Sequence, residues 1–176
     1  KSIKNKKQNN SSNSLELVFF LSSSAYDGEF SNNGWLQETP DSISKVTWDN
    51  VAIMSNMTAK KLKVENEELI DIKYNGAEVE MPAWILPGHA DNQISVQVGY
   101  GRAFNCKVAK NVGSNVYPLM NGSFSNMSIS VSGTGKKYNI ACTQDHHGMN
   151  LDSAADKEVQ NSLPDIYREL NLSEYK

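Results

Sequence analysis

Hydrophobic and polar residues alternate in several short stretches of the chain. Residues 69–74 and 77–81 both alternate, and Asn75-Gly76 between them tolerates the positive φ angles of a type I′ turn. This pattern predicts a β-hairpin. Its buried positions are Ile70, Ile72, Tyr74, Val79 and Met81. Its water-facing positions are Lys73, Glu78 and Glu80.

Other apolar stretches predict further strands. Residues 15–21 are apolar except for Glu16 and do not alternate, which favours a strand buried on both faces. Residues 46–48 and 51–54 form a second strand region, and residues 94–98 alternate again. Pro82 cannot donate to a sheet ladder, so it predicts an edge position or a bulge.

The remaining internal segments are predicted from turn and cap residues. Residues 127–131 and 138–142 alternate on either side of Gly133-Thr134-Gly135, which predicts a second hairpin. Residues 113–119 predict one more short loop and strand. Ser55 is a good N-cap for a short helix that ends near Leu62.

These elements predict a mainly β, barrel-like domain over residues 15–145, with short helices. Residues 1–14 hold four lysines, four asparagines and almost no apolar side chain, so we expect a disordered leader. Residues 146–176 are expected to form a linker and a helical C-terminal extension. In that extension, apolar residues recur at helical spacing around Pro164: Val159, Leu163, Ile166 and Leu170.

Composition excludes several classes of function. A chain of 176 residues with 39% hydrophobic residues is large enough for one domain with a core. A net charge of -3 argues against general nucleic-acid binding, which needs a positive surface. The longest apolar run, 17–21, is far below the ~20 residues of a membrane span. The 2 cysteines, Cys106 and Cys142, are too few for an iron-sulfur cluster or a cysteine zinc site.

Three groups of residues invite a catalytic interpretation, and each is weak. Asp145-His146-His147 places two imidazoles side by side, but neighbouring side chains on an extended chain point to opposite faces. His89-Ala90-Asp91 offers a base with an acid to orient it, and residues 22–24 offer serine nucleophiles, but no motif marks these serines. We therefore predict neither catalytic residues nor metal ligands in this chain.

Two segments leave binding and structural interpretations open. Residues 26–34, rich in Ser, Asn and Gly, follow the first predicted strand and are either a binding loop or a surface excursion. Gly99-Tyr100-Gly101-Arg102 ends a predicted strand, where glycines either expose the backbone to a ligand or simply form a turn.

The order of these segments resembles the molybdopterin dinucleotide-binding domain of oxidoreductases of the dimethyl sulfoxide reductase type. The segments that carry the resemblance are residues 51–55, 58–62, 69–76, 87–92 and 98–102. More closely, Trp-Leu-Gln-Glu at 35–38 and Gln-Asp-His-His-Gly-Met at 144–149 resemble the fused molybdopterin-like and iron-sulfur subunit of alternative complex III, a quinol-oxidising complex of bacteria.

The resemblance implies a double-psi β-barrel whose loops hold the molybdopterin guanine dinucleotide cofactor, while other domains ligate the metal. The implied cofactor contacts are Ser22, Ser23, Ser24, His89, Asp91, Asn92, Tyr100, Gly101, Arg102 and Asn115. In the alternative complex III subunit, the molybdopterin-like part has lost its cofactor and serves as a scaffold. Electrons are carried there by clusters in a following ferredoxin-like domain.

We therefore expect a scaffold domain of a periplasm-facing subunit, whose partners are other domains of its own chain and subunits of a membrane complex. The start at Lys1 and the end at Lys176 fit a piece of a longer chain. One alternative is the cofactor-holding domain of an active molybdenum reductase. Another is a stand-alone β-barrel that binds carbohydrate or a protein partner.

Overall fold

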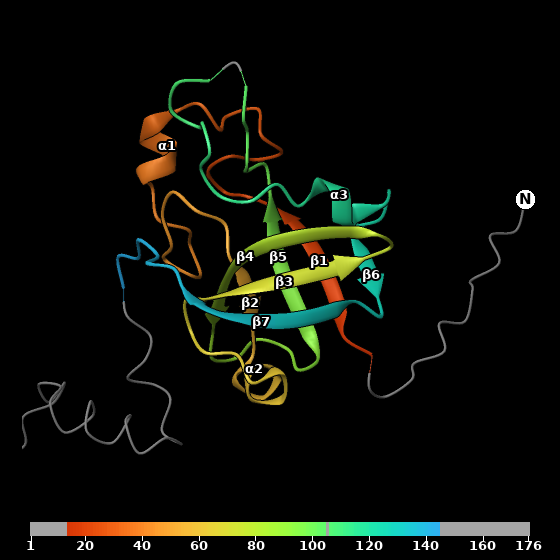
Figure 1. Cartoon of the computed structure of the whole chain (residues 1–176). Helices are drawn as coiled ribbons and strands as arrows, with labels where there is room; N and C mark the ends of the chain where they lie inside the picture. The colour runs from red at the N-terminus through yellow and green to blue at the C-terminus, as the bar shows by residue number, and fades with distance from the viewer. Residues whose placement is uncertain (1–13, 105, 145–176) are drawn as a thin grey trace, which may run out of the picture. The chain divides into compact units, whose positions relative to one another are not determined.

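The structure is a computed structural model, and it describes residues 14–104 and 106–144 (Figure 1). The strands are β1 (Glu16–Leu21), β2 (Ala52–Met54), β3 (Glu68–Tyr74), β4 (Ala77–Ile85), β5 (Gln93–Val98), β6 (Ser125–Met127) and β7 (Ser130–Lys137). The helices are α1 (Gly34–Glu38), α2 (Asn56–Leu62) and α3 (Tyr117–Met120). The predicted mainly β fold with short helices is confirmed. The predicted helical extension, and all but Ser14 of the predicted leader, lie outside the described residues.

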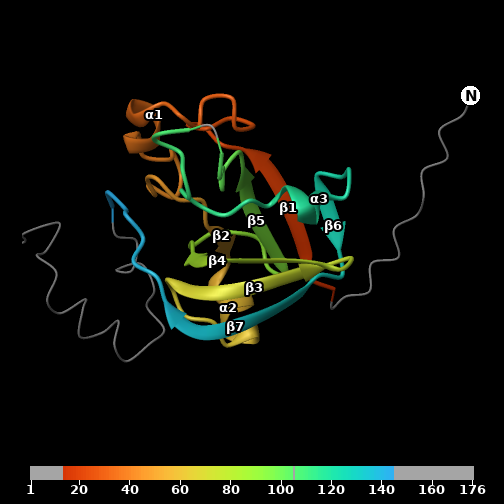
Figure 2. The same cartoon turned by 45° about the horizontal axis from the view of Figure 1, so that its top comes forward.

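All seven strands form one mixed sheet in the order β6-β1-β5-β2-β4-β3-β7. β1 runs parallel to β5 and β2 runs parallel to β4, whereas β5 and β2 are antiparallel. The connection from β1 to β2 therefore skips over β5, and the connection from β4 to β5 skips over β2. The sheet curls into a half-barrel, and β3 and β7 run crosswise to β1 and β5 (Figure 2).

The two edges of this sheet are consecutive segments of the chain. β6 pairs with β1 and β7 pairs with β3, and only two residues separate them. Ser128 at this junction has a φ of 64°, and its backbone N–H donates to the Leu15 carbonyl over 3.0 Å. The chain thus turns from one edge of the sheet to the other.

The predicted hairpin around the glycines at 133 and 135 is wrong, because both glycines lie inside β7. A Cβ atom on Gly133 would lie 2.5 Å from Oε1 of Glu68, and the same oxygen accepts the N–H of Gly135 over 2.9 Å. The glycines therefore permit close approach to a buried carboxylate on β3. Cys142, which was predicted in the second arm of this hairpin, instead forms an isolated β-bridge with Val46 through its backbone.

The hairpin of β3 and β4 is confirmed, with Asn75 and Gly76 at φ angles of 49° and 84°. Pro82 has a ladder partner on β3 alone, as an edge position requires, although β4 as a whole lies between β2 and β3. Pro82 pairs with Leu69 of β3, and the next residue, Ala83, pairs with Ala52 of β2. Pro82 marks the position where β4 changes its partner.

Two further predictions, for β1 and for the segment before β6, need correction. The prediction that β1 is buried on both faces is wrong, because Leu17 and Phe19 face the core while Val18 and Phe20 are only partly buried. The strand predicted within residues 113–119 is also wrong. The helix α3 begins there, with Pro118 in its first turn, where the missing N–H costs no hydrogen bond.

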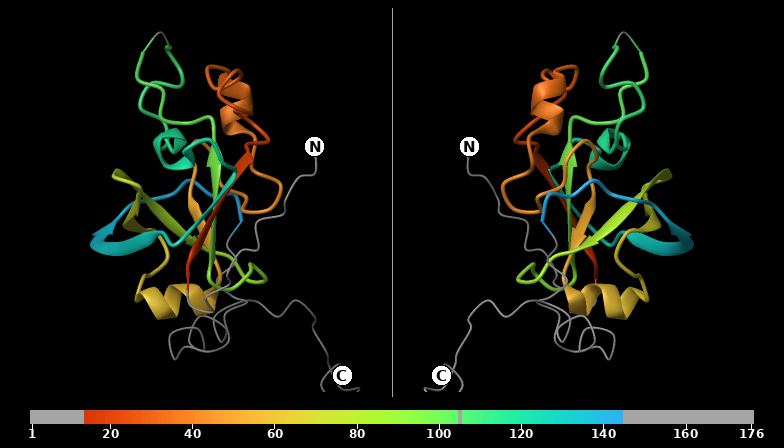
Figure 3. Two further views of the ribbon diagram at one scale, coloured as in Figure 1. Left: turned by 90° about the vertical axis from the view of Figure 1, so that its right-hand side faces the viewer. Right: turned by 90° about the vertical axis from the view of Figure 1, so that its left-hand side faces the viewer.

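The main core lies on the inner face of the curled sheet. Its fully buried side chains include Leu17, Met54, Ile70, Ile72, Met81, Ile94 and Val96. A smaller apolar cluster lies on the outer face and consists of Val46, Val51, Ile53 and Trp84. α1 and α2 lie at opposite ends of the sheet (Figure 3), so loops at these two ends cannot share one site.

Candidate functional site

The ten residues implied to contact a cofactor fall into two groups at opposite ends of the sheet. Because β1 and β5 are parallel neighbours, the loops that follow them meet at one end. This group contains residues 22–24, residues 100–102 and Asn115. His89, Asp91 and Asn92 belong to the turn that precedes β5 at the other end, where Asp91 and Asn92 lie beside α2, whereas His89 reaches Ser95 on the sheet.

At the first end, the hydroxyl groups of Ser22 and Tyr100 form a hydrogen bond with each other. Ser22 Oγ and the Tyr100 hydroxyl lie 3.0 Å apart, and Ser22 Oγ also accepts the backbone N–H groups of Ser24 and Ala25, each over 3.1 Å. Burial raises the pKa of Tyr100, and the hydrogen bond from Ser22 only partly opposes this. Both hydroxyl groups therefore stay neutral and internally paired.

The glycines around Tyr100 pack against the protein's own backbone. Gly99 has a φ of 99°, and a Cβ atom there would lie 2.7 Å from the Tyr26 carbonyl oxygen. Gly101 has a φ of 76°, and a Cβ atom there would lie 2.3 Å from the Asn115 nitrogen. The space beside both glycines is thus filled by neighbouring loops. The turn interpretation of these glycines is the one that the geometry favours.

Three other residues at this end keep polar groups at the surface. Arg102 is exposed and uses Nη2 to donate to the Gly28 carbonyl over 3.0 Å. Asn115 is exposed, and its Oδ1 accepts the Tyr117 N–H over 3.1 Å. The exposed Ser23 donates only a long hydrogen bond of 3.4 Å to Asp41.

Three buried polar residues that hold this end together were not identified from the sequence. Asp41 accepts hydrogen bonds from the Ser44 N–H over 2.8 Å, the Ser44 hydroxyl over 2.9 Å and Gln97 Nε2 over 2.8 Å. Asn50 is fully buried; its Nδ2 donates to the carbonyls of Gln97 and Ser114, and its Oδ1 accepts the Ser114 N–H over 2.7 Å. No motif marked Asp41, Asn50 or Gln97, although Asp-x-x-Ser at 41–44 is a common pattern of side-chain to backbone bonding.

At the other end, Asp91 and Asn92 attach the turn before β5 to α2. Ser55 Oγ caps α2 by accepting the Thr58 N–H over 3.1 Å, and it donates to Asp91 Oδ1. The Asn92 N–H donates to Thr58 Oγ1 over 2.9 Å, and Lys61 Nζ donates to Asn92 Oδ1 over 2.8 Å. These contacts explain both residues as parts of a helix-to-turn junction.

His89 lies half-buried on the outer face of the sheet. Its Nε2 lies 2.9 Å from Ser95 Oγ, and its Nδ1 lies 3.1 Å from the Ala90 carbonyl oxygen. Burial lowers the pKa of His89 below its usual 6.5, and the Ala90 carbonyl opposes this only in part. The acid that could orient this base, Asp91, is instead bonded to Ser55.

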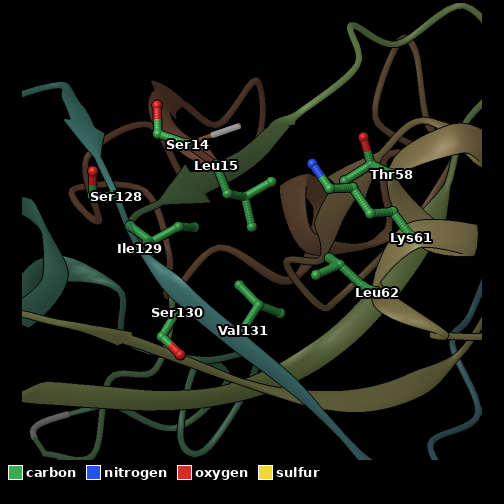
Figure 4. A pocket seen from close by; sticks show the side chains of 9 residues that line it. All are labelled: Ser14, Leu15, Thr58, Lys61, Leu62, Ser128, Ile129, Ser130 and Val131. Carbon is green, nitrogen blue, oxygen red and sulfur yellow. The ribbon is translucent and has the colours of Figure 1, made fainter. Parts of the chain in front are cut away.

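Two cavities flank α2. The first, of about 420 Å³, lies between α2, the start of β1 and the β6–β7 junction, and the apolar side chains of Leu15, Leu62, Ile129 and Val131 face one another across it (Figure 4). The second, of about 430 Å³, shares Thr58 and Lys61 with the first and is also lined by Met57, Lys60, Asp91 and Asn92.

The remaining candidate chemistry is limited. Asp145-His146-His147 lies outside the described residues. Within residues 14–104 and 106–144, no three His, Cys, Asp or Glu side chains are grouped as metal ligands would be, and both cysteines are free thiols. No helix in the same residues combines the length and apolar character that a bilayer span requires.

Comparison with known proteins gives no family assignment. No protein-family model matches the chain, and no curated protein matches it significantly.

Proposed function

We propose that this chain is a molybdopterin dinucleotide-binding-like domain with a double-psi β-barrel fold. Its proposed role is that of a scaffold in an oxidoreductase subunit of a bacterial quinol-oxidising complex, on the periplasmic side of the membrane. Its partners would be the other molybdopterin-like and iron-sulfur domains of its own chain, together with membrane-complex subunits.

The strand connections support the fold part of this proposal. A double-psi barrel contains two interlocked crossovers, each of which skips one strand that belongs to the other crossover. Here β1 connects to β2 past β5, and β4 connects to β5 past β2. The outer pairs agree as well, because β6 is antiparallel to β1 as β3 is antiparallel to β4. Exchanging β1, β2 and β3 with β4, β5 and β6 therefore reproduces the pairings among these six strands, and β7 is an additional strand beside β3.

One observation carries the scaffold part of the proposal. The glycines around Tyr100, which could leave backbone open to a dinucleotide, pack instead against Tyr26 and Asn115. The Tyr100 hydroxyl is bonded to Ser22 rather than directed outward. A dinucleotide at this end would have to displace contacts that the protein makes with itself.

Equilibrium binding of guanosine diphosphate (GDP), which reproduces the nucleotide part of the cofactor, tests this role. We expect no binding to the 176-residue chain at micromolar concentrations. Micromolar affinity that is weakened by Arg102→Ala would overturn the scaffold role, because Arg102 is the exposed cation beside Gly28. Affinity unchanged by Arg102→Ala would place the nucleotide elsewhere and leave this end a scaffold.

A second candidate function is the cofactor-holding domain of an active molybdenum reductase. The exposed polar groups of Arg102, Asn115 and Ser23 at one end of the sheet favour it, because a dinucleotide needs such groups for its phosphates and ribose. Molybdenum and pterin analysis of the purified parent protein separates the two functions. Stoichiometric metal would support the reductase, and absence of metal would support the scaffold.

A further inference from the structure

Ser95 and His89 form a hydrogen-bonded pair on the outer face of the sheet. Ser95 lies in the middle of β5, and its Oγ lies 2.9 Å from Nε2 of His89. The other ring nitrogen, Nδ1, faces the Ala90 carbonyl oxygen at 3.1 Å. A carbonyl oxygen can only accept, so Nδ1 carries the ring proton and Nε2 offers its lone pair to the Ser95 hydroxyl.

This pair lies at the wall of an apolar cavity on the outer face of the sheet. The cavity has a volume of about 300 Å³ and is lined by Val18, Phe20, Asp41, Ile43, Ile53, Leu86, His89 and Ser95. Such a volume is at the lower end of the range for small-molecule sites, which are mostly apolar with a few polar groups. It fits a short apolar group rather than a large cofactor.

The charges around the cavity leave the imidazole neutral at pH 7. Burial holds the pKa of His89 below 6.5. The other ionisable residue that lines the cavity is Asp41, and its carboxylate is occupied by Ser44 and Gln97. Asp91, two residues from His89, is bonded to Ser55. A neutral imidazole beside a serine hydroxyl is the arrangement in which histidine acts as a general base.

We propose that Ser95 and His89 are a nucleophile and its general base, which accept the acyl group of small apolar esters. Ser95 Oγ bonds to the acyl carbon while its proton passes to His89 Nε2. The same proton passes to the alcohol oxygen as the ester C–O bond breaks, and water later hydrolyses the acyl-serine to a carboxylic acid. The site does not depend on the proposed scaffold role, because that role rests on the contacts of Tyr100 with Ser22 and of Gly101 with Asn115, and none of these four residues lines the cavity.

The strand around Ser95 limits the rate of this reaction. β5 pairs with β1 on one side and β2 on the other, so its own backbone N–H groups are committed to the sheet. An oxyanion therefore receives no donor from this strand, and the loss of one such donor typically slows acyl transfer by about 100-fold to 1,000-fold. We expect one acylation per chain followed by slow hydrolysis, and not rapid turnover.

Incubation with 4-nitrophenyl butyrate at neutral pH tests the proposal. We expect release of one nitrophenolate per chain and one butyryl group located on Ser95 by mass spectrometry of peptides. Ser95→Ala should abolish this labelling, and His89→Gln should slow it by at least about 100-fold, the lower limit for a positioned general base. Ser130→Ala, at an exposed serine of β7, is the matched control and should react like the wild type.

The pH dependence of acylation gives a readout that a purely structural role of His89 would not produce. The rate should rise with pH as His89 loses its proton and reach half its maximum below pH 6.5, because the His89 pKa is lowered. Butyryl groups spread over lysines, labelling that persists in Ser95→Ala, or a rate without this transition would each overturn the proposal. Circular dichroism of each variant confirms that a lost signal is not a lost fold.

Discussion

Gly101 in the loop after β5 and Asn115 in the loop before α3 pack backbone against backbone. A Cβ atom added to Gly101 would lie 2.3 Å from the Asn115 nitrogen and 2.8 Å from its Cα. Both residues belong to the set implied to contact a cofactor, and the structure shows them in contact with each other. The contact joins two loops that lie at the same end of the sheet.

Gly101→Ala should strongly destabilise the domain. The new methyl group would overlap the Asn115 backbone, which cannot move aside as a flexible side chain can, and the φ of 76° is unfavourable for any residue with a Cβ atom. Left-handed backbone costs about 1–2 kcal/mol and overpacking about 1–3 kcal/mol, so we expect a loss of roughly 2–5 kcal/mol. Urea unfolding followed by circular dichroism measures this loss.

Gly122→Ala is the matched control for this change. Gly122 has a φ of 74°, almost the same as Gly101, but nothing lies within 4 Å of its added Cβ atom. It should therefore show only the backbone cost of about 1–2 kcal/mol. Equal losses in the two variants would show that the contact between Gly101 and Asn115 contributes nothing to stability.

Asn50→Ala should loosen the loop that carries Ser114. The Asn50 side chain makes hydrogen bonds to both the N–H and the carbonyl of Ser114 and to the Gln97 carbonyl, and all of them would be lost inside the protein. Each buried polar group left unpaired costs about 1–3 kcal/mol. We expect a loss of at least about 2 kcal/mol, together with faster hydrogen exchange at Ser114. The exposed Asn139→Ala is the control, and equal exchange rates would contradict the prediction.

The sequence predicted well where one short segment determines its own structure. Asn75-Gly76 between two alternating stretches is sufficient for the hairpin of β3 and β4, and Ser55 is sufficient to start α2. The prediction failed where a residue far away in the sequence determines the local structure. The glycines inside β7 look like a turn, because nothing in the local sequence shows that Glu68 lies beside them.

The candidate site was predictable only in part for the same reason. The sequence indicated that residues 22–24 and 100–102 follow strands, but it could not show that β1 and β5 are adjacent and parallel. The resemblance grouped His89, Asp91 and Asn92 with these residues, but all three precede β5, and Asp91 and Asn92 lie beside α2. The network of Asp41, Asn50 and Gln97 was missed, because burial of a polar side chain depends on the whole fold.

Ser55 and Asp91 should be energetically coupled. Ser55 caps α2 and donates to Asp91, so Ser55→Ala removes both interactions, and a lost cap costs about 0.5–2 kcal/mol. Asp91→Ala leaves the cap in place and should cost less. The double variant should lose less than the sum of the two single variants, by about 1 kcal/mol or more. Urea unfolding of the four proteins measures this difference, and strict additivity would show that Asp91 does not support α2.

The stability of the domain should fall in acid through Asp41. Burial by itself would raise the pKa of Asp41, but hydrogen bonds from Ser44, Ile43 and Gln97 together outweigh it and hold the pKa below the usual 3.8. A carboxyl group whose pKa is lower in the folded state than in the unfolded state stabilises the fold above about pH 4. That contribution is lost as the pH falls through the folded-state pKa.

Asp41→Asn should therefore change the shape of the stability curve as well as its height. The variant should be less stable at neutral pH, because its Nδ2 would face the donor Nε2 of Gln97, and its free energy of unfolding should decline less than that of the wild type below about pH 4. Urea unfolding at several pH values between about 2 and 7 measures both effects. Glu38→Gln, at an exposed carboxylate, is the control and should parallel the wild type. If the Asp41→Asn curve also runs parallel to the wild type in acid, the hydrogen bonds to Asp41 do not favour its charged form.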